Sequence, residues 1–134
     1  MKHLEDTFHK AINQYLTILQ NQGKIDKFTY NASGEKRTKI TGALLKAKGL
    51  RKGLPDYTIG KNRNIFIVNG NEQKEKITIS FYLHLEAKTG KNKQTKEQIE
   101  FEERTKNINN EMYRVVRSIE DVEKALDEFK RIST

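Results

Sequence analysis

The sequence predicts an α/β domain in which a mixed central sheet is flanked by helices. Segments whose apolar residues follow a helical period alternate with segments of strand period. One helical segment lies between two strands, as the crossover between parallel strands requires. A chain of 134 residues suffices for one hydrophobic core but not for two. We therefore expect a single domain over residues 1–134.

The N-terminal third is predicted to begin with an amphipathic helix over residues 3–22. Its apolar residues share one helical face, and Gly23 follows at the position of a C-terminal cap. Residues 24–31 alternate irregularly, which indicates either an edge strand or an extended connector. A short helix is predicted over residues 38–48, ended by Gly49.

The middle of the chain has the strand period. Strands are predicted over residues 56–59 and 64–68, on either side of a turn at residues 60–62, and a second turn is expected over residues 69–74. The strongest strand pattern covers residues 77–88 and alternates apolar with polar side chains throughout. We expect one face of this strand to pack in the core and the other to carry the chemistry.

The C-terminal part contains a helix, a strand and a last helix. Thr95 followed by Gln98 is a capping-box pattern that predicts a helix start. A strand is predicted over residues 112–116, and Ser118 opens a final helix that runs to about Lys130.

The charge balance favours a polyanionic partner. The chain has 26 Lys and Arg against 18 Asp and Glu, a net charge of +8, and this indicates nucleic acid before an anionic membrane surface. Residues 24–61 hold ten basic and three acidic residues, a net of +7 (10 − 3). A solvated face without a ligand is the alternative. We predict that this block binds DNA through Lys36, Arg37, Lys39, Lys46, Lys48, Arg51 and Lys52.

Several classes of protein are excluded. The chain has no cysteine, which excludes disulfide scaffolds, thiol nucleophiles and cysteine-ligated metal centres. The longest apolar run covers residues 65–68, far short of the roughly 20 residues of a membrane helix. No apolar stretch of a signal peptide begins the chain. We expect a cytoplasmic protein without a membrane partner.

Asp56, Glu86 and Lys88 form the candidate reactive group. Glu86 and Lys88 stand two positions apart in a strand and so project from one face, about 6.6 Å from each other. Asp56 begins another strand of the same expected sheet. Two carboxylates that converge at strand ends make a hard oxygen site suited to Mg²⁺ or Mn²⁺.

This combination suits phosphodiester hydrolysis. A metal can polarise a phosphoryl oxygen and lower the pKa of a bound water, while the lysine orients the nucleophile or offsets charge on phosphorus. Taken alone, Glu86 and Lys88 would more often be a cross-strand ion pair.

Four parts of the sequence together resemble a known family. They are residues 49–56 (GLRKGLPD), residues 86–90 (EAKTG), Gln98, and residues 113–118 (YRVVRS). The chain resembles the virus-type replication-repair nuclease (VRR-NUC) domain of the PD-(D/E)XK superfamily over nearly its whole length. The resemblance implies the restriction-endonuclease-like fold of that superfamily.

The resemblance also implies roles for single residues. Asp56 and Glu86 would hold the metal together with the backbone carbonyl of Ala87, and Lys88 would serve catalysis. The first helix would contribute a glutamate, which falls on Glu5.

Three assignments have alternatives. Asp6 could take the role of Glu5. Gln98 lies near the active site by resemblance, but its capping-box position is an equally good explanation. His84 shares the face of Glu86 and is more readily interpreted as a bystander.

The implied function is that of a Mg²⁺- or Mn²⁺-dependent DNA endonuclease of recombination, repair or phage replication, in a bacterial or phage-infected cell. The resemblance further implies a homodimer that cuts four-way junctions, although the sequence shows no apolar stripe beyond what one core needs. The alternatives are a non-catalytic nucleic-acid-binding module on the same fold, a flap or nicking nuclease, and a structural partner of an acidic protein.

Overall fold

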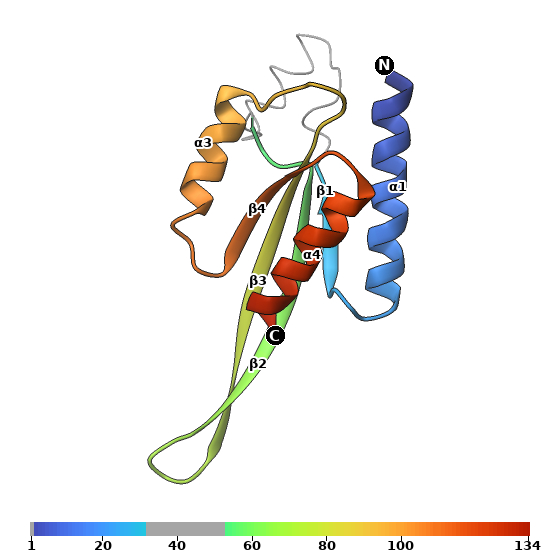
Figure 1. Ribbon diagram of the computed structural model, residues 1–134. Coiled ribbons are helices and arrows are strands. Elements are labelled where there is room, and N and C mark those ends of the chain that lie inside the picture. The colour runs from blue at the N-terminus through green and yellow to red at the C-terminus, as the bar shows by residue number, and fades with distance from the viewer. Residues whose placement is uncertain (1, 32–52) are drawn as a thin grey trace, which may run out of the picture.

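A computed structural model describes residues 2–31 and 53–134 of the chain (Figure 1). Within these ranges it has three helices and a four-stranded mixed sheet, which confirms the α/β prediction. The elements are α1 (Lys2–Asn21), β1 (Lys27–Tyr30), β2 (Tyr57–Val68), β3 (Lys74–Ala87), α3 (Lys96–Thr105), β4 (Glu111–Val116) and α4 (Ile119–Ser133). The helix predicted over residues 38–48 lies outside the described residues, as do the predicted DNA-binding residues Lys36, Arg37, Lys39, Lys46, Lys48, Arg51 and Lys52.

The strands follow each other across the sheet in the order β1-β2-β3-β4. The pairs β1–β2 and β2–β3 are antiparallel, whereas β3 and β4 are parallel. Because α3 connects the two parallel strands, the predicted crossover helix is confirmed. Residues 27–30 form the edge strand β1, so the first of the two interpretations of residues 24–31 is confirmed.

The predicted turn at residues 60–62 is wrong. Strand β2 continues through it, and Gly60 and Lys61 pair with Tyr82 and Phe81 of β3. A glycine can lie inside a strand when a neighbouring strand continues the hydrogen-bond pairing past it, and β3 is that neighbouring strand here. The expected turn after residue 68 is confirmed at the tip, where Asn69 Oδ1 accepts hydrogen bonds from two backbone N–H groups.

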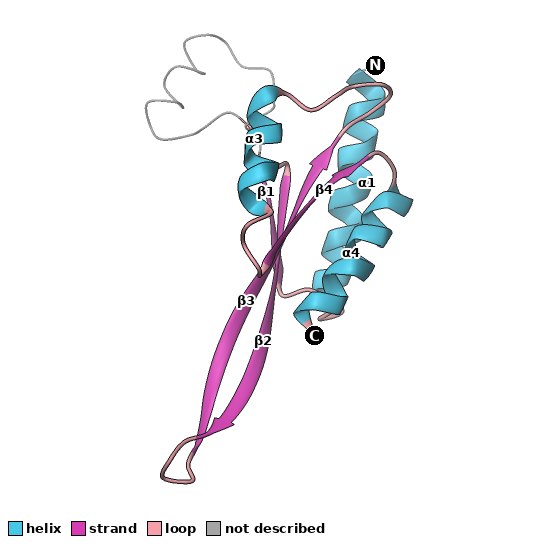
Figure 2. Ribbon diagram, turned by 60° about the vertical axis from the view of Figure 1, so that its left-hand side comes forward, coloured by secondary structure: helices cyan, strands magenta, loops and turns pink. Residues whose placement is uncertain are grey.

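Helices cover both faces of the sheet at the end where all four strands meet (Figure 2). The first face packs against α1 and α4, and the buried side chains there form the hydrophobic core. Phe101 of α3 contacts the rings of His84 and Tyr113 on the second face. The core comprises Ile12, Leu16, Leu19, Ile25, Tyr57, Ile59, Phe81, Leu83, Leu85, Ala87, Val116, Val122, Ala125 and Phe129.

Beyond the core, β2 and β3 continue as a two-stranded hairpin that projects from the domain (Figure 1). We call residues 61–80 the arm. Ile77, predicted to pack in the core, is 43% exposed on it. That prediction fails at Ile77 because the helices end before this part of the sheet, whereas Ile79 packs partly buried against the core. Among the described helices, none has the length and apolar content needed to cross a membrane.

Candidate active site

Asp56 stands immediately before β2, at the end of the sheet away from the arm. Its backbone carbonyl accepts a hydrogen bond from Asn31 N at 2.7 Å, which ties it to the end of β1. The pairing of Tyr57 with Leu85 places Asp56 beside Glu86 on the second face. The Asp56 carboxylate accepts a hydrogen bond from the backbone N–H of Ala87, with an Oδ2–N distance of 2.9 Å.

Glu86 is the most buried charged side chain of the site, with only 3% of the residue exposed. Its Oε1 accepts a hydrogen bond from Gln98 Nε2 at 2.6 Å and lies 3.7 Å from the ammonium nitrogen of Lys88. Its Oε2 is buried and has no hydrogen-bond donor among the described residues. An ionised carboxylate oxygen that is buried without a donor is costly for a protein. Protonation of Glu86, with a hydrogen bond between its carboxyl group and that of Asp56, removes this cost, and a bound cation would do the same.

The two carboxyl groups perturb each other. Burial raises the pKa of Glu86 to about 8, with a further contribution from the negative charge of Asp56 that the Lys88 ammonium partly offsets. Burial also raises the pKa of Asp56, against the opposing effect of the Ala87 N–H. The site therefore holds more negative charge than its own donors stabilise, as expected where a cation binds.

Gln98 both completes the capping box of α3 and contacts Glu86 of the candidate site. It sits at the third position of α3, where its Oε1 accepts from Thr95 N at 2.8 Å and its own N–H donates to Thr95 Oγ1 at 3.2 Å. The other end of the same amide donates to Glu86. The capping box thus fixes the orientation of an amide that holds Glu86 in place.

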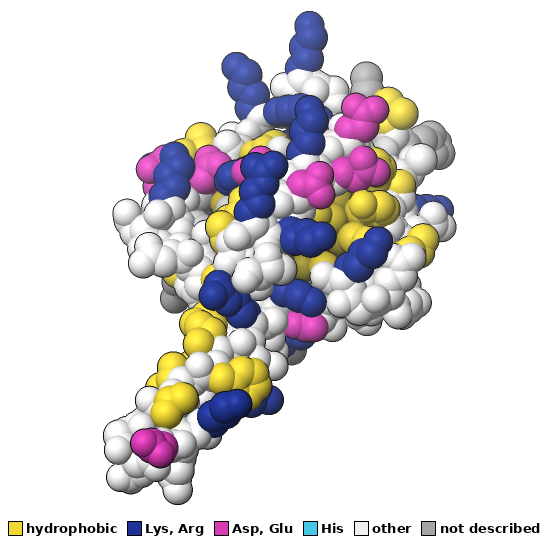
Figure 3. Space-filling view, turned by 60° about the horizontal axis from the view of Figure 1, so that its bottom comes forward, with side chains coloured by type: hydrophobic (Ala, Val, Ile, Leu, Met, Phe, Trp, Pro, Cys, Tyr) yellow, Lys and Arg dark blue, Asp and Glu magenta, His cyan; other side chains and the backbone are white. Residues whose placement is uncertain are grey.

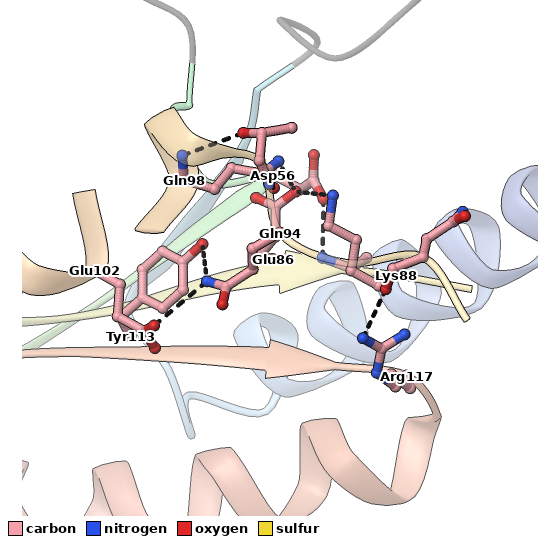
Figure 4. A network of polar contacts seen from close by, with 11 residues as sticks. Asp56, Glu86, Lys88, Gln94, Gln98, Glu102, Tyr113 and Arg117 are labelled. Atoms are coloured by element: carbon pink, nitrogen blue, oxygen red, sulfur yellow. Dashed lines mark hydrogen bonds and ion pairs between the residues drawn. The ribbon is translucent and has the colours of Figure 1, made fainter. Parts of the chain in front are cut away.

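A wider polar network surrounds these residues (Figure 4). Gln94 Nε2 lies 3.4 Å from both Tyr113 Oη and Glu102 Oε1, and burial raises the pKa of Tyr113. The Arg117 guanidinium donates to the backbone carbonyls of Gly90 and Asn92, in the loop that follows Lys88. No sequence pattern marked Gln94 as a functional residue, and its place directly before the N-cap of α3 is the one signal that could have done so.

The structure does not bring Glu5 into this group. Glu5 lies exposed in the first turn of α1, and Asp6, which follows it, is also exposed. Across residues 2–31 and 53–134, no three His, Asp or Glu side chains gather as metal ligands. The candidate metal site described here thus has two carboxylates, Asp56 and Glu86.

Two histidines lie near the site. His84 is buried beneath Phe101 and interacts with Thr58 Oγ1 at 2.9 Å and Glu111 Oε1 at 2.6 Å, which agrees with its interpretation as a bystander. His9, which no sequence pattern marks as functional, interacts with Tyr57 Oη at 2.9 Å and lowers the pKa of Asp56 when charged.

Comparison of the chain with protein-family models, with curated proteins and with solved structures finds no match. The geometry of Asp56, Glu86, Lys88 and Gln98 is therefore the basis of a functional proposal.

Proposed function

We propose that this protein is a metal-dependent DNA endonuclease with a restriction-endonuclease-like fold, similar to the VRR-NUC domains. The observation that carries the proposal is the convergence of Asp56, Glu86 and Lys88 at one end of β2 and β3, with the buried Glu86 Oε2 left without a donor. The resemblance to the family supports the same three residues. We further propose that it acts in the cytoplasm of a bacterial or phage-infected cell.

The donor set fits a hard divalent cation. Carboxylate oxygens are the ligands that Mg²⁺ and Mn²⁺ prefer, and the raised pKa values of Asp56 and Glu86 mark negative charge that such an ion would offset. Asp56 and Glu86 would hold the metal, and the Ala87 carbonyl is a further ligand by resemblance. When bound, the metal supplies polarisation of a phosphoryl oxygen and a water of lowered pKa.

Lys88 and Gln98 have separate tasks in this proposal. The Lys88 side chain is 14% exposed and lies beside Glu86, so its ammonium is positioned to offset negative charge that develops on the phosphate. Gln98 is a positioning residue, because it contacts Glu86 and the backbone of Thr95. A purely structural Glu86–Lys88 ion pair would require neither a second buried carboxyl group nor an unsatisfied oxygen.

The deciding experiment is cleavage of supercoiled plasmid with Mg²⁺ and with chelator. Asp56→Asn, Glu86→Gln and Lys88→Ala should each lower the cleavage rate by about 100-fold or more. The matched control is Glu100→Gln, an exposed carboxylate on α3. Full activity in chelator, or in the Glu86→Gln variant, would contradict the proposal.

DNA binding is measured beside cleavage, and Lys88→Ala should retain at least part of it. A wild-type protein that binds DNA and never cuts it would instead support the non-catalytic binding module.

Branched DNA, in particular the four-way junction, is the substrate that the resemblance implies. The net charge of +8 supports a phosphate-rich substrate bound with strong salt dependence. Cleavage of junction, flap and linear duplex of matched sequence tests this choice. A preference for flaps would assign the protein to the flap nucleases with the same catalytic residues.

A further inference from the structure

The arm carries large apolar side chains that no other described part of the chain covers. Phe66 and Val68 are each 65% exposed, Ile77 is 43% exposed and Ile67 is 41% exposed. Hydrophobic and basic side chains lie together on the arm in the space-filling view (Figure 3). Exposed apolar side chains that cluster on a projecting element mark an interaction surface. The expectation that the chain has no apolar stripe beyond its core is therefore wrong.

One face of the arm continues the face of the sheet that carries Asp56 and Glu86. Because side chains alternate along a strand, the even-numbered residues of β2 and β3 share this second face. On the arm it consists of four cross-strand pairs, which are Asn62 with Ser80, Asn64 with Thr78, Phe66 with Lys76, and Val68 with Lys74. We call these eight residues the lysine face of the arm.

The lysine face is basic. Lys74 and Lys76 are both exposed, and between them and Glu86 neither β2 nor β3 places an acidic residue on this face. The pairing of Lys27 with Gly60 adds a third exposed lysine, from the edge strand β1. The Lys27 side chain lies against Gly60, where an added Cβ would be 3.4 Å from Lys27 Cγ. Three lysines thus lie along one face, from the base of the arm to its tip.

Apolar side chains stand beside two of these lysines. Phe66 is the cross-strand partner of Lys76, and Val68 is that of Lys74. In nucleic-acid complexes, lysines bind phosphates while apolar and aromatic side chains contact bases. The opposite face of the arm is less suited to a polyanion, because it holds isoleucines together with Glu75.

The length of this face matches one turn of duplex DNA. Glu86 and Lys76 are ten residue steps apart (86 − 76), which is about 33 Å at about 3.3 Å per step. One helical turn of DNA is about 34 Å long, and after one turn each strand again presents a phosphate to the same side. A two-stranded β-ribbon is also narrow enough for the major groove. A duplex that meets the site with one phosphate would therefore meet the arm one turn away.

We propose that the lysine face of the arm binds duplex DNA about one helical turn from the phosphate that the active site cuts. Lys74 and Lys76 would bind phosphates, and Phe66 would lie in the groove between them. Because Phe101 places α3 over β3 and β4, the duplex would pass along β1 and β2, beside Lys27. The inference rests on the proposed function, since the active site defines where the cut phosphate lies.

The experiment compares the affinities for hairpin-capped duplexes of about 8 and about 20 base pairs, measured by fluorescence anisotropy. The shorter duplex is about 27 Å long at about 3.4 Å per base pair, so it reaches the site or the arm but not both. All proteins carry Glu86→Gln, so that the DNA stays intact during the titration. The parent protein should bind the longer duplex at least about tenfold more tightly, because two linked contacts then act together.

The variant that tests the arm is Lys74→Ala with Lys76→Ala. It should lose most of the preference for the longer duplex, and its salt dependence should become shallower by about 1.8, at about 0.9 per lost phosphate contact. Arg63→Ala is the matched control, because Arg63 is an exposed cation on the opposite face of the same arm. It should keep the preference. All three side chains are exposed, so the variants should fold like the parent protein.

The outcomes for the arm and for the nuclease are separable. An unchanged length preference in the lysine variant, or an equal loss in Arg63→Ala, would overturn the proposal for the arm. A protein that shows the expected preference but never cuts plasmid would keep the arm and lose the nuclease. A nuclease whose preference is independent of Lys74 and Lys76 would keep the active site and lose the arm, and a protein that binds no DNA would overturn both.

Discussion

Replacing Glu86 with glutamine should stabilise the metal-free protein at alkaline pH, although it removes a residue of the proposed active site. Burial and the neighbouring Asp56 carboxylate raise the pKa of Glu86 from 4.5 to about 8 in the folded chain. A carboxyl group whose pKa is raised by folding contributes its full stability below its unfolded pKa. That stability is lost as the pH rises toward the folded pKa. The loss should therefore occur between pH 4.5 and about 8.

The size of the effect follows from the same shift. At about 1.36 kcal/mol per pKa unit, ionising Glu86 in the folded protein costs at most about 5 kcal/mol. Glutamine removes this charge and can still accept the hydrogen bond from Gln98, but it also leaves Lys88 without its 3.7 Å partner. We therefore expect a net gain in unfolding free energy of about 2–4 kcal/mol near pH 8, and almost none near pH 4.

Urea denaturation in chelator, followed by circular dichroism, measures this difference. Subtracting wild type from variant at each pH cancels the titration of carboxylates away from the site, and the difference reports Glu86 together with its neighbour Asp56. Glu100→Gln is the matched control, since Glu100 lies exposed on the same helix as Gln98, and its difference should stay near zero. A Glu86→Gln protein that is less stable than wild type near pH 8, by an amount independent of pH, would refute the reasoning.

Three further outcomes are expected. Addition of about 10 mM Mg²⁺ should raise the melting temperature of wild type and not that of Glu86→Gln, because only an ion bound to the folded state stabilises it; equal shifts in calorimetry would place the ion elsewhere. Gly53→Ala should lower the free energy of unfolding by about 1–3 kcal/mol, since φ is +83° and an added Cβ would lie 2.6 Å from the backbone of Glu97. Gly23→Ala, where φ is +74° and the added Cβ meets open space, should lower it by less in the same urea titration. Leu83→Ala should lower the free energy of unfolding by about 2–5 kcal/mol in a denaturant titration, because Leu83 is fully buried between the sheet and the helices. A decrease below about 1 kcal/mol would contradict this packing.

Some features of the candidate site could be predicted from local sequence patterns, and others could not. Alternation along β3 placed Glu86 and Lys88 on one face, and the structure has both there. The capping box of Thr95 and Gln98 was predicted from four consecutive residues. The hydrogen bond from Gln98 to Glu86 could not be derived from that box, since it depends on where α3 lies on the sheet.

The failed predictions have a common cause. The sequence 60–62 (GKN) carries a turn signal, and the β3 partners of these residues overrode it. Ile77 matched the core pattern of its strand, yet it is exposed because α1 and α4 end before this part of the sheet. Both outcomes depend on residues far away in the sequence.

The α/β class, the starts of α3 and α4, the basic character of the chain and the side chains of the candidate site could be predicted from the sequence, because periodicity, capping and charge are local properties. Only packing between distant segments shows that Glu86 is buried beside Asp56 with one oxygen unsatisfied, and that Ile67 and Ile77 of the arm are exposed. The physical reason is that burial, and with it the pKa of a carboxyl group, depends on which elements cover a surface. That covering is set by packing between segments far apart in the chain.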